Sequence, residues 1–308
     1  MDRRKSAGSA VGGKRLSART AVPYLFIAPS LVLLTIFFAI PVVIAFLMSF
    51  TDFDIYSLAN LSFARFVGFR NYANLYSDPL FWKAMFNTFY FLVVGAPLTI
   101  LVALTAAVLL NSKLVRFKSV LRVGYFAPVV ATLVAVSVVW KYIYDPHFGL
   151  LNYVLSFIGV SPHDWLSNPF WAMPAIILFA VWKNFGYTMM IFLAGLQTIP
   201  EALYEAAEID GAGPFQRFWK ITVPMLAPTT LFVTVVTLIE YLQLFAEPYI
   251  MTGGGPVDST LSIVLMMYRQ GFRYWQMGYA ASIAFVLAAV IFILTMIEMK
   301  IQGEARAA

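Results

Sequence analysis

The sequence predicts an all-α polytopic membrane protein in which six transmembrane helices cross the bilayer. Of the 308 residues, 61% are hydrophobic and only 12% are charged, whereas an ordinary soluble domain has about 25% charged residues. Several uninterrupted apolar stretches reach the roughly 20 residues that a helix needs to cross about 30 Å of hydrocarbon. Because these stretches do not alternate between apolar and polar residues, a membrane β-barrel is excluded.

The six spans are delimited by charged and turn-forming residues on either side of each apolar stretch. The first stretch, residues 23–50, is longer than the roughly 7 to 15 apolar residues of a signal-peptide core, so we expect an uncleaved first span. The spans are predicted at residues 24–49, 86–110, 122–144, 171–196, 226–247 and 278–299.

These spans form one membrane domain, residues 23–300, with a short tail on each side. We expect the basic tail 1–22 to be disordered because it is rich in Ser, Ala and Gly. Residues 301–308 form a short C-terminal tail. Basic residues gather before the first span, between the second and third spans, and after the fourth. Because cytoplasmic connections carry the excess of Lys and Arg, both tails are predicted to be cytoplasmic.

Composition also excludes several kinds of site. The sequence has no cysteine and only two histidines, so it predicts no disulfide and no metal centre. The net charge of +6 does not indicate nucleic-acid binding, because the basic residues stand at the ends of apolar stretches. Gly8, Gly13 and Lys14 have the spacing of a phosphate-binding loop, but Arg15 stands where Ser or Thr would bind magnesium. We therefore expect this chain to bind no nucleotide or other cofactor.

Segment 198–228, between the fourth and fifth spans, predicts a helix, a turn and a second short helix in the cytoplasm. Thr198 and Glu201 have the spacing of a capping box at the start of the first helix. Gly211 ends that helix and Pro214 begins the second. The first helix carries four acidic residues and no basic one, whereas a helix lying on anionic lipid should be basic. A protein partner is therefore favoured over the membrane surface.

Ten residues of this segment stand in register with the EAA motif, and through them the chain resembles binding-protein-dependent ABC importer permeases. They are Glu205, Ala206, Ala207, Asp210, Gly211, Ala212, Phe215, Ile221, Pro224 and Pro228. The resemblance implies the type I ABC importer permease fold and a coupling helix that docks in a cleft of a cytoplasmic ATPase. The ATPase-coupling residues that it implies are Glu201, Glu205, Ala206, Ala207, Asp210, Gly211, Ala212, Pro214 and Phe215.

The same resemblance implies partners and a location. A permease of this kind lies in the cytoplasmic (inner) membrane of a bacterium or archaeon and pairs with a second permease subunit as a heterodimer. Two copies of a cytoplasmic ABC ATPase hold the ATP and Mg, and an extracytoplasmic binding protein delivers the solute. The chain itself is then a translocation subunit without catalytic residues.

Four further stretches resemble carbohydrate-uptake permeases of the maltose and glycerol-phosphate type, most closely the maltose-subunit branch. They are FVGFRNY at 66–72, FLAGLQTIP at 192–200, PYIMTGGGP at 248–256 and MGYAAS at 277–282. This resemblance implies that the cargo is a sugar or a sugar-like solute. An amino acid, a peptide or a polyol phosphate is the alternative, because selection of the cargo resides largely in the binding protein.

Two charged residues lie at equal depth within predicted spans. Lys183 and Glu240 are each roughly 14 residues, or about 21 Å, from the cytoplasmic segment that joins their spans. Unpaired charges are costly at that depth, so we expect an ion pair or a shared hydrated cavity. The candidate substrate pathway consists of these two residues and their polar neighbours: Lys183, Asn184, Tyr187, Thr188, Thr237, Glu240, Tyr241 and Gln243.

Polar residues at these positions can also bond between helices, as they do in many helix bundles. The resemblance favours Thr237 and Tyr241 as solute contacts, because they fall where the maltose subunit has sugar-contacting residues. With Glu240 in the set, a neutral or cation-bearing solute is favoured over a polyanion.

A membrane-embedded enzyme is the alternative from another functional class. It would need a cluster of carboxylates or histidines at the membrane edge. The candidates are Asp145, His147, His163 and Asp164 on an outer loop. A hydrated loop explains the same residues without catalysis.

Overall fold

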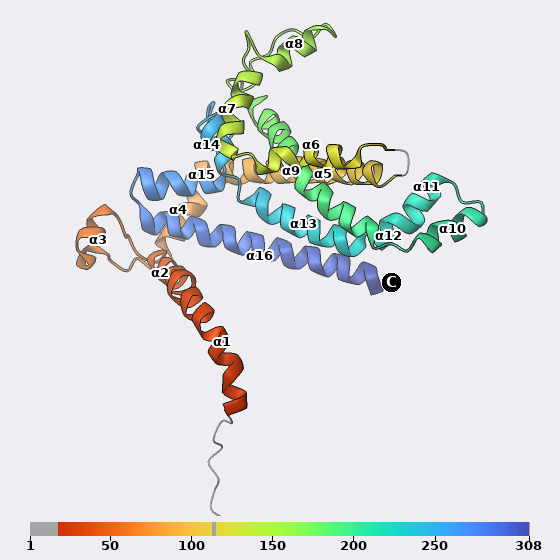
Figure 1. Cartoon of the computed structure of the whole chain (residues 1–308). Coiled ribbons are helices and arrows are strands. Elements are labelled where there is room, and N and C mark those ends of the chain that lie inside the picture. Colours follow the sequence, from red (N-terminus) through yellow and green to blue (C-terminus); the bar gives the residue numbers. More distant parts are fainter. Residues whose placement is uncertain (1–17, 113–114, 308) are drawn as a thin grey trace, which may run out of the picture. The chain divides into compact units, whose positions relative to one another are not determined.

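The structure, a computed structural model, describes residues 18–112 and 115–307 (Figure 1). Within these residues the secondary structure is helical, and the β-type pairing is limited to an isolated bridge between Thr51 and Phe66. The all-α prediction is therefore confirmed. The chain divides into two compact units, residues 1–47 and 48–308.

The described part of the first unit consists of consecutive helical segments, the last of which reaches Met48, and Tyr24–Met48 contains no charged residue. A π-helical turn interrupts the α-helix where Pro41, which lacks a backbone N–H, follows. Residues 1–17 of the predicted N-terminal tail lie outside the described residues. The elements are α1 (Ala18–Leu34), η1 (Thr35–Ala39) and α2 (Ile40–Met48).

Four long helices organise the second unit: α5 (Pro79–Asn111), α9 (Ala172–Gln197), α13 (Ala227–Leu242) and α16 (Met277–Ala307). Helix α5 runs along α9, and α13 packs on α5, α9 and α16. Small residues allow this close approach. A Cβ atom on Gly95 of α5 would lie 2.6 Å from the ring of Tyr241 on α13.

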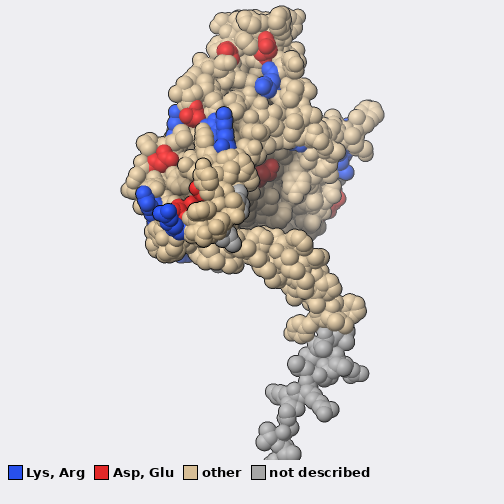
Figure 2. All heavy atoms as spheres, turned by 90° about the vertical axis from the view of Figure 1, so that its left-hand side faces the viewer, with Lys and Arg blue, Asp and Glu red and all other residues tan. Residues whose placement is uncertain are grey.

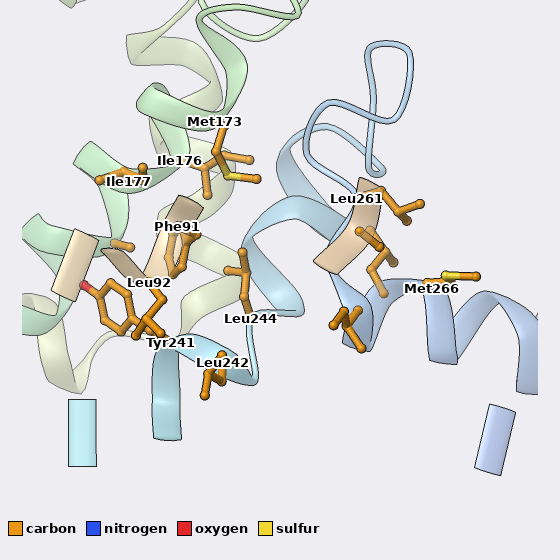
Figure 3. Close-up of a cluster of buried hydrophobic side chains, with 14 of the residues drawn as sticks. Phe91, Leu92, Met173, Ile176, Ile177, Tyr241, Leu242, Leu244, Leu261 and Met266 are labelled. Atoms are coloured by element: carbon orange, nitrogen blue, oxygen red, sulfur yellow. The ribbon is translucent and has the colours of Figure 1, made fainter. Parts of the chain in front are cut away.

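Buried apolar side chains from α5, α9 and α13 form the main core. Phe91, Ile176 and Tyr241 belong to it, and Figure 3 shows the rings of Phe91 and Tyr241 beside each other. A second cluster, which includes Ala103, Phe192 and Leu226, lies further along the same helices. The two clusters hold α5, α9 and α13 together along much of their length.

Shorter elements connect these helices. The segment before α5 contains α3 (Ile55–Ala59), η2 (Leu61–Phe63) and α4 (Arg70–Ser77). Between α9 and α13 lie α10 (Glu201–Ile209), α11 (Pro214–Arg217), η3 (Phe218–Thr222) and α12 (Val223–Met225). Other short elements are α8 (Leu150–Ser156), α14 (Ala246–Met251), α15 (Ile263–Tyr268) and η4 (Arg269–Arg273).

Among the described residues, five helical segments are long and apolar enough to cross a membrane. They are Tyr24–Met48, Pro79–Asn111, Ala172–Gln197, Ala227–Met251 and Met277–Ile301, and each overlaps a predicted span. The predicted third span, 122–144, is broken into α6 (Lys118–Val130) and α7 (Leu133–Ile143), which meet at 99°. If this bent pair is one span, the described residues hold up to six.

Large apolar side chains cover much of the described surface. Leu101 on α5 and Phe292 on α16 are each more than half exposed, and on the face shown in Figure 2 charged side chains are scattered among uncharged ones. A surface of this kind suits contact with lipid or with another membrane subunit.

Candidate functional site

The break between α6 and α7 is held by Lys183 of α9. The Lys183 ammonium donates hydrogen bonds to the carbonyl oxygens of Pro128, Val129 and Ala131, at 2.6, 3.0 and 3.0 Å. The last carbonyls of a helix have no partner within it, and an ammonium group has three protons to donate. Lys183 therefore completes the end of α6 and has no further proton to donate.

Close backbone packing brings α6 to this position. Gly186 lies three residues after Lys183 on α9, and a Cβ atom there would collide with the backbone oxygen of Tyr125 on α6. The Tyr125 ring also meets the ring of Phe185 edge-on, with centroids 5.7 Å apart. The place where α6 ends is thus set by contacts with α9.

A second break separates α13 from α14 at residues 243–245. The carbonyl oxygen of Leu244 in this break accepts a hydrogen bond of 2.5 Å from the Ser262 hydroxyl. Helix α14 packs against α7, and the two lie together in Figure 1. The two broken helices consequently meet in one region of the second unit.

A cavity of about 270 Å³ lies where the two breaks meet. Leu133, at the start of α7, lines it together with residues of the break between α13 and α14. Its wall combines aromatic rings, two amides and two carboxylates, which suits a polar solute with apolar faces. The lining residues are Phe91, Leu133, Asn184, Glu240, Tyr241, Gln243, Leu244, Phe245, Ala246 and Glu247.

Tyr241 connects this cavity to the core. Its ring stacks on Phe91 at a centroid distance of 4.8 Å, and its hydroxyl lies 2.5 Å from the Thr99 hydroxyl of α5. Only 1% of its surface is exposed. Tyr241 therefore fixes α13 on α5 and also forms part of the cavity wall.

The cavity brings together four of the eight residues predicted for the substrate pathway: Asn184, Glu240, Tyr241 and Gln243. Thr188 and Thr237 are buried and do not line it, and Tyr187 is 46% exposed outside it. The ion pair hypothesised between Lys183 and Glu240 is absent from the described residues, because the ammonium is bonded to the carbonyls of α6 instead.

The sequence reasoning missed Glu247. This carboxylate follows Glu240 by seven residues, which is close to two helical turns and therefore the same face of an α-helix. This seven-residue spacing is the signal in the sequence that points to Glu247, whereas the apolar stretch predicts residue 247 only as the end of the fifth span.

Segment 198–228 forms the predicted helix, turn and second helix. Helix α10 ends at Ile209 with Asp210 as its C-cap, and Gly211 follows with a φ of +79°, a left-handed conformation that favours glycine. The predicted capping box is wrong. The Thr198 hydroxyl donates to the Gly195 carbonyl at 2.8 Å, and α10 has Pro200 at its N-cap with no side-chain cap bond.

Internal contacts make this segment a defined body, here called the α10–α11 knob (residues 201–217). Arg217 of α11 forms an ion pair of 2.9 Å with Glu208 of α10. The Tyr204 hydroxyl lies 2.9 Å from the Thr222 hydroxyl in η3. Two apolar residues of the knob remain largely exposed, Ile209 at 87% and Phe215 at 75%. A body of this kind presents an apolar contact surface.

The predicted coupling residues all lie on the knob. Ala207 and Ala212 are half-buried, where they support the turn through a hydrogen bond of 2.8 Å from the Ala212 N–H to the Ala207 carbonyl. The other seven are exposed: Glu201, Glu205, Ala206, Asp210, Gly211, Pro214 and Phe215.

The polar residues of the loop between α7 and α9 close local turns. The N–H groups of Phe148 and His147 donate to Asp145 and hold the pKa of its carboxyl below the ordinary value. Asp164 accepts from the Ser167 N–H at 3.0 Å. Across the described residues, no three His, Asp or Glu side chains gather in a way that could hold a metal ion.

Comparison with known proteins identifies the family. Residues 17–301 match the family described as "Binding-protein-dependent transport system inner membrane component". The chain belongs to this family, and it is therefore a multi-pass permease component of the inner membrane, as predicted.

Two relatives and one solved structure illustrate the similarity. The lactose transport system permease protein LacF of Rhizobium radiobacter is 37% identical over 288 residues, which are 92% of this chain and 94% of the relative. The arabinooligosaccharides transport system permease protein AraP of Bacillus subtilis is 35% identical over 293 residues, 93% of this chain and 90% of the relative. A solved structure with the same fold is a chain of a bacterial alginate ABC transporter, crystallised in complex with an alginate pentasaccharide-bound periplasmic protein. The TM-score is 0.76 at 23% sequence identity, and the match covers 91% of this chain and 93% of that chain.

Proposed function

We propose that this chain forms half of the translocation pathway of an ATP-driven importer for a sugar or a sugar-like solute. One observation carries the proposal: the exposed α10–α11 knob is joined directly to both α9 and α13, and these same helices contribute Asn184 and Glu240 to the cavity. A displacement of the knob is thereby passed to two walls of the cavity.

The continuity of the chain supports this coupling. Three residues, 198–200, separate α9 from α10, and the turns η3 and α12 lead from α11 into α13 without a loop. Rigid elements joined in this way transmit a rigid-body movement between two packed arrangements. The exposed Ile209 and Phe215 are suited to insertion in a cleft of a partner protein.

The proposal includes the arrangement in the membrane and the partners. Six spans are formed when α6 and α7 together count as one, and the basic residues place both termini in the cytoplasm. A second permease subunit completes the pathway, and two copies of a cytoplasmic ABC ATPase bind ATP and Mg and dock on the knob. An extracytoplasmic binding protein delivers the solute. The chain contributes no catalytic residue, and ATP hydrolysis takes place on the ATPase.

A sugar cargo fits the lining of the cavity. The Phe91 and Phe245 side chains offer aromatic faces, and the Asn184 and Gln243 amides offer both donors and acceptors of hydrogen bonds. Sugar rings need both kinds of contact, because they carry hydroxyl groups around apolar faces. The names of the lactose and arabinooligosaccharide relatives point to the same class of cargo.

The knob provides the test. In the full importer reconstituted in liposomes, the double variant Ile209→Ser/Phe215→Ser should lose ATP-driven uptake of the solute and co-purify poorly with the ATPase, because the apolar contact is gone. The control is Ile158→Ser, which changes an isoleucine that is 73% exposed elsewhere on the chain. Unchanged uptake by the double variant would refute the coupling role of the knob.

A further inference from the structure

We infer that the cavity between the two broken helices selects a solute that carries a positive charge, such as an amino sugar. The inference rests on the proposed function, because it names the charge of the cargo that the same cavity admits. Glu240 and Glu247 both line the cavity, and they are its only charged lining residues among those described. Seven residues separate them along the chain, on either side of the break between α13 and α14.

The nearby cation does not neutralise these carboxylates by direct pairing. Lys183 precedes the cavity residue Asn184, but its three protons are donated to the carbonyls of Pro128, Val129 and Ala131. The ion pairs between described residues join Arg217 to Glu208 and Arg269 to Asp258. Neither Glu240 nor Glu247 has an ion-pair partner in the described chain.

Glu240 and Glu247 both lie in the segment Ala227–Met251, which is apolar enough to span a membrane. Ionised side chains within a span are costly and are retained where they meet a counter-charge, water or a substrate. Lys183 acts electrostatically on both carboxylates, so one positive charge faces two negative ones. A cationic solute supplies the second counter-charge, whereas an anionic solute of the same size is repelled.

The remaining lining fits a sugar that carries an amine. The aromatic faces of Phe91 and Phe245 and the amides of Asn184 and Gln243 can receive the ring and its hydroxyl groups, while an ammonium group lies between the two carboxylates. The cavity volume of about 270 Å³ is on the scale of a small polar solute.

Three matched probes test the charge preference. The importer, containing this chain, its partner permease and the ATPase but no binding protein, is purified in lipid nanodiscs. Binding of the β-1,4-linked disaccharides of glucosamine, glucose and glucuronate is then measured by calorimetry. We expect the glucosamine disaccharide to bind about tenfold more tightly than the neutral one, the glucuronate disaccharide to bind least, and the preference to weaken as salt increases.

Variants locate the preference in the cavity. In Glu240→Gln/Glu247→Gln the glucosamine and glucose disaccharides should bind equally, while binding of the neutral sugar is retained. The control Asp164→Asn removes an acidic side chain of the outer loop and should keep the preference. If the double variant does not assemble, the two single variants and the salt dependence of binding to the unmodified importer test the charge preference instead.

The outcomes separate this inference from the proposed function. Equal binding of the glucosamine and glucose disaccharides by the unmodified importer, binding of none of the three, or a preference that survives in the double variant would each overturn the charge selection. If the carboxylates instead pair with the second permease subunit, the unmodified importer will show no preference. None of these outcomes bears on the proposed function, which is tested by assembly with the ATPase, by uptake and by the knob variant.

Discussion

Lys183 stabilises a helix that stops inside the membrane domain. Its ammonium donates to three carbonyls at distances of 2.6 to 3.0 Å. Where hydrocarbon excludes water, a carbonyl without an internal partner carries a large free-energy cost. The buried lysine is tolerated because each of its protons is used. The same bonds permit α6 to end at Val130, three residues before α7 begins at Leu133.

Replacing Lys183 should therefore destabilise the protein. We expect Lys183→Met to lower the free energy of unfolding by about 2 to 4 kcal/mol, since it leaves three partly buried carbonyls without a donor. Lys183→Arg should retain part of the stability. Thermal unfolding in detergent checks this, with Lys141→Met, which removes an exposed lysine of α7, as the control. Equal melting temperatures for Lys183→Met and Lys141→Met would contradict the role.

At the scale of the elements, the cavity exists because two helices break at the same place. Helices α6 and α7 diverge by 99°, and α13 gives way to α14 across residues 243–245. Irregular backbone within a membrane domain is tolerated where it lines a cavity or is buried in protein. In transporters, discontinuous helices of this kind often surround the substrate.

The contact of α6 with α9 can be tested through two glycines. Gly186→Ala should destabilise the protein even though alanine favours a helix, because its Cβ collides with the Tyr125 backbone and pushes α6 away from Lys183. Gly124→Ala on α6 is the matched control, since a Cβ there meets nothing within 4 Å. The control should be neutral or more stable by about 0.5 to 1 kcal/mol. The rate of hydrogen exchange of the α6 amides should rise only in Gly186→Ala. If these amides are as well protected in Gly186→Ala as in Gly124→Ala, the close packing of α6 on α9 is contradicted.

At the scale of the whole second unit, contacts between distant parts of the sequence fix the loop after α14. The Asn87 amide on α5 donates to the carbonyls of Asp258 and Leu261, each at 2.9 Å. Arg269 pairs with Asp258 at 3.1 Å. The glycine-rich stretch before Pro256 is therefore attached to both α5 and η4 through the residues that follow it.

Asn87→Ala should loosen this attachment. We expect a loss of about 1 to 3 kcal/mol in the free energy of unfolding, because two carbonyls lose a buried donor. Limited proteolysis should then cut within residues 252–262 earlier than in the unmodified protein. The control Asn74→Ala removes an exposed amide and should leave both readouts unchanged. If the loop of Asn87→Ala resists proteolysis as well as the loop of the unmodified protein does, the anchoring is disproved.

The sequence predicted the placement of the long helices because apolar stretches of spanning length are a local property. It did not predict the break in the third span, because the donor that completes α6 comes from Lys183, 52 to 55 residues away. It placed Asn184, Glu240 and Gln243 in one pathway because they lie at similar depth. It missed Glu247 because the continuation of the span into α14 depends on packing against α7.

Joining both α9 and α13 to one short knob has a geometric consequence. Helix α9 has 26 residues and is therefore about 39 Å long. A tilt of about 5° at the end next to the knob swings its opposite end by roughly 3 Å, about the width of a water molecule. A slight rocking of the knob is enough to alter the aperture that a solute encounters on the far side.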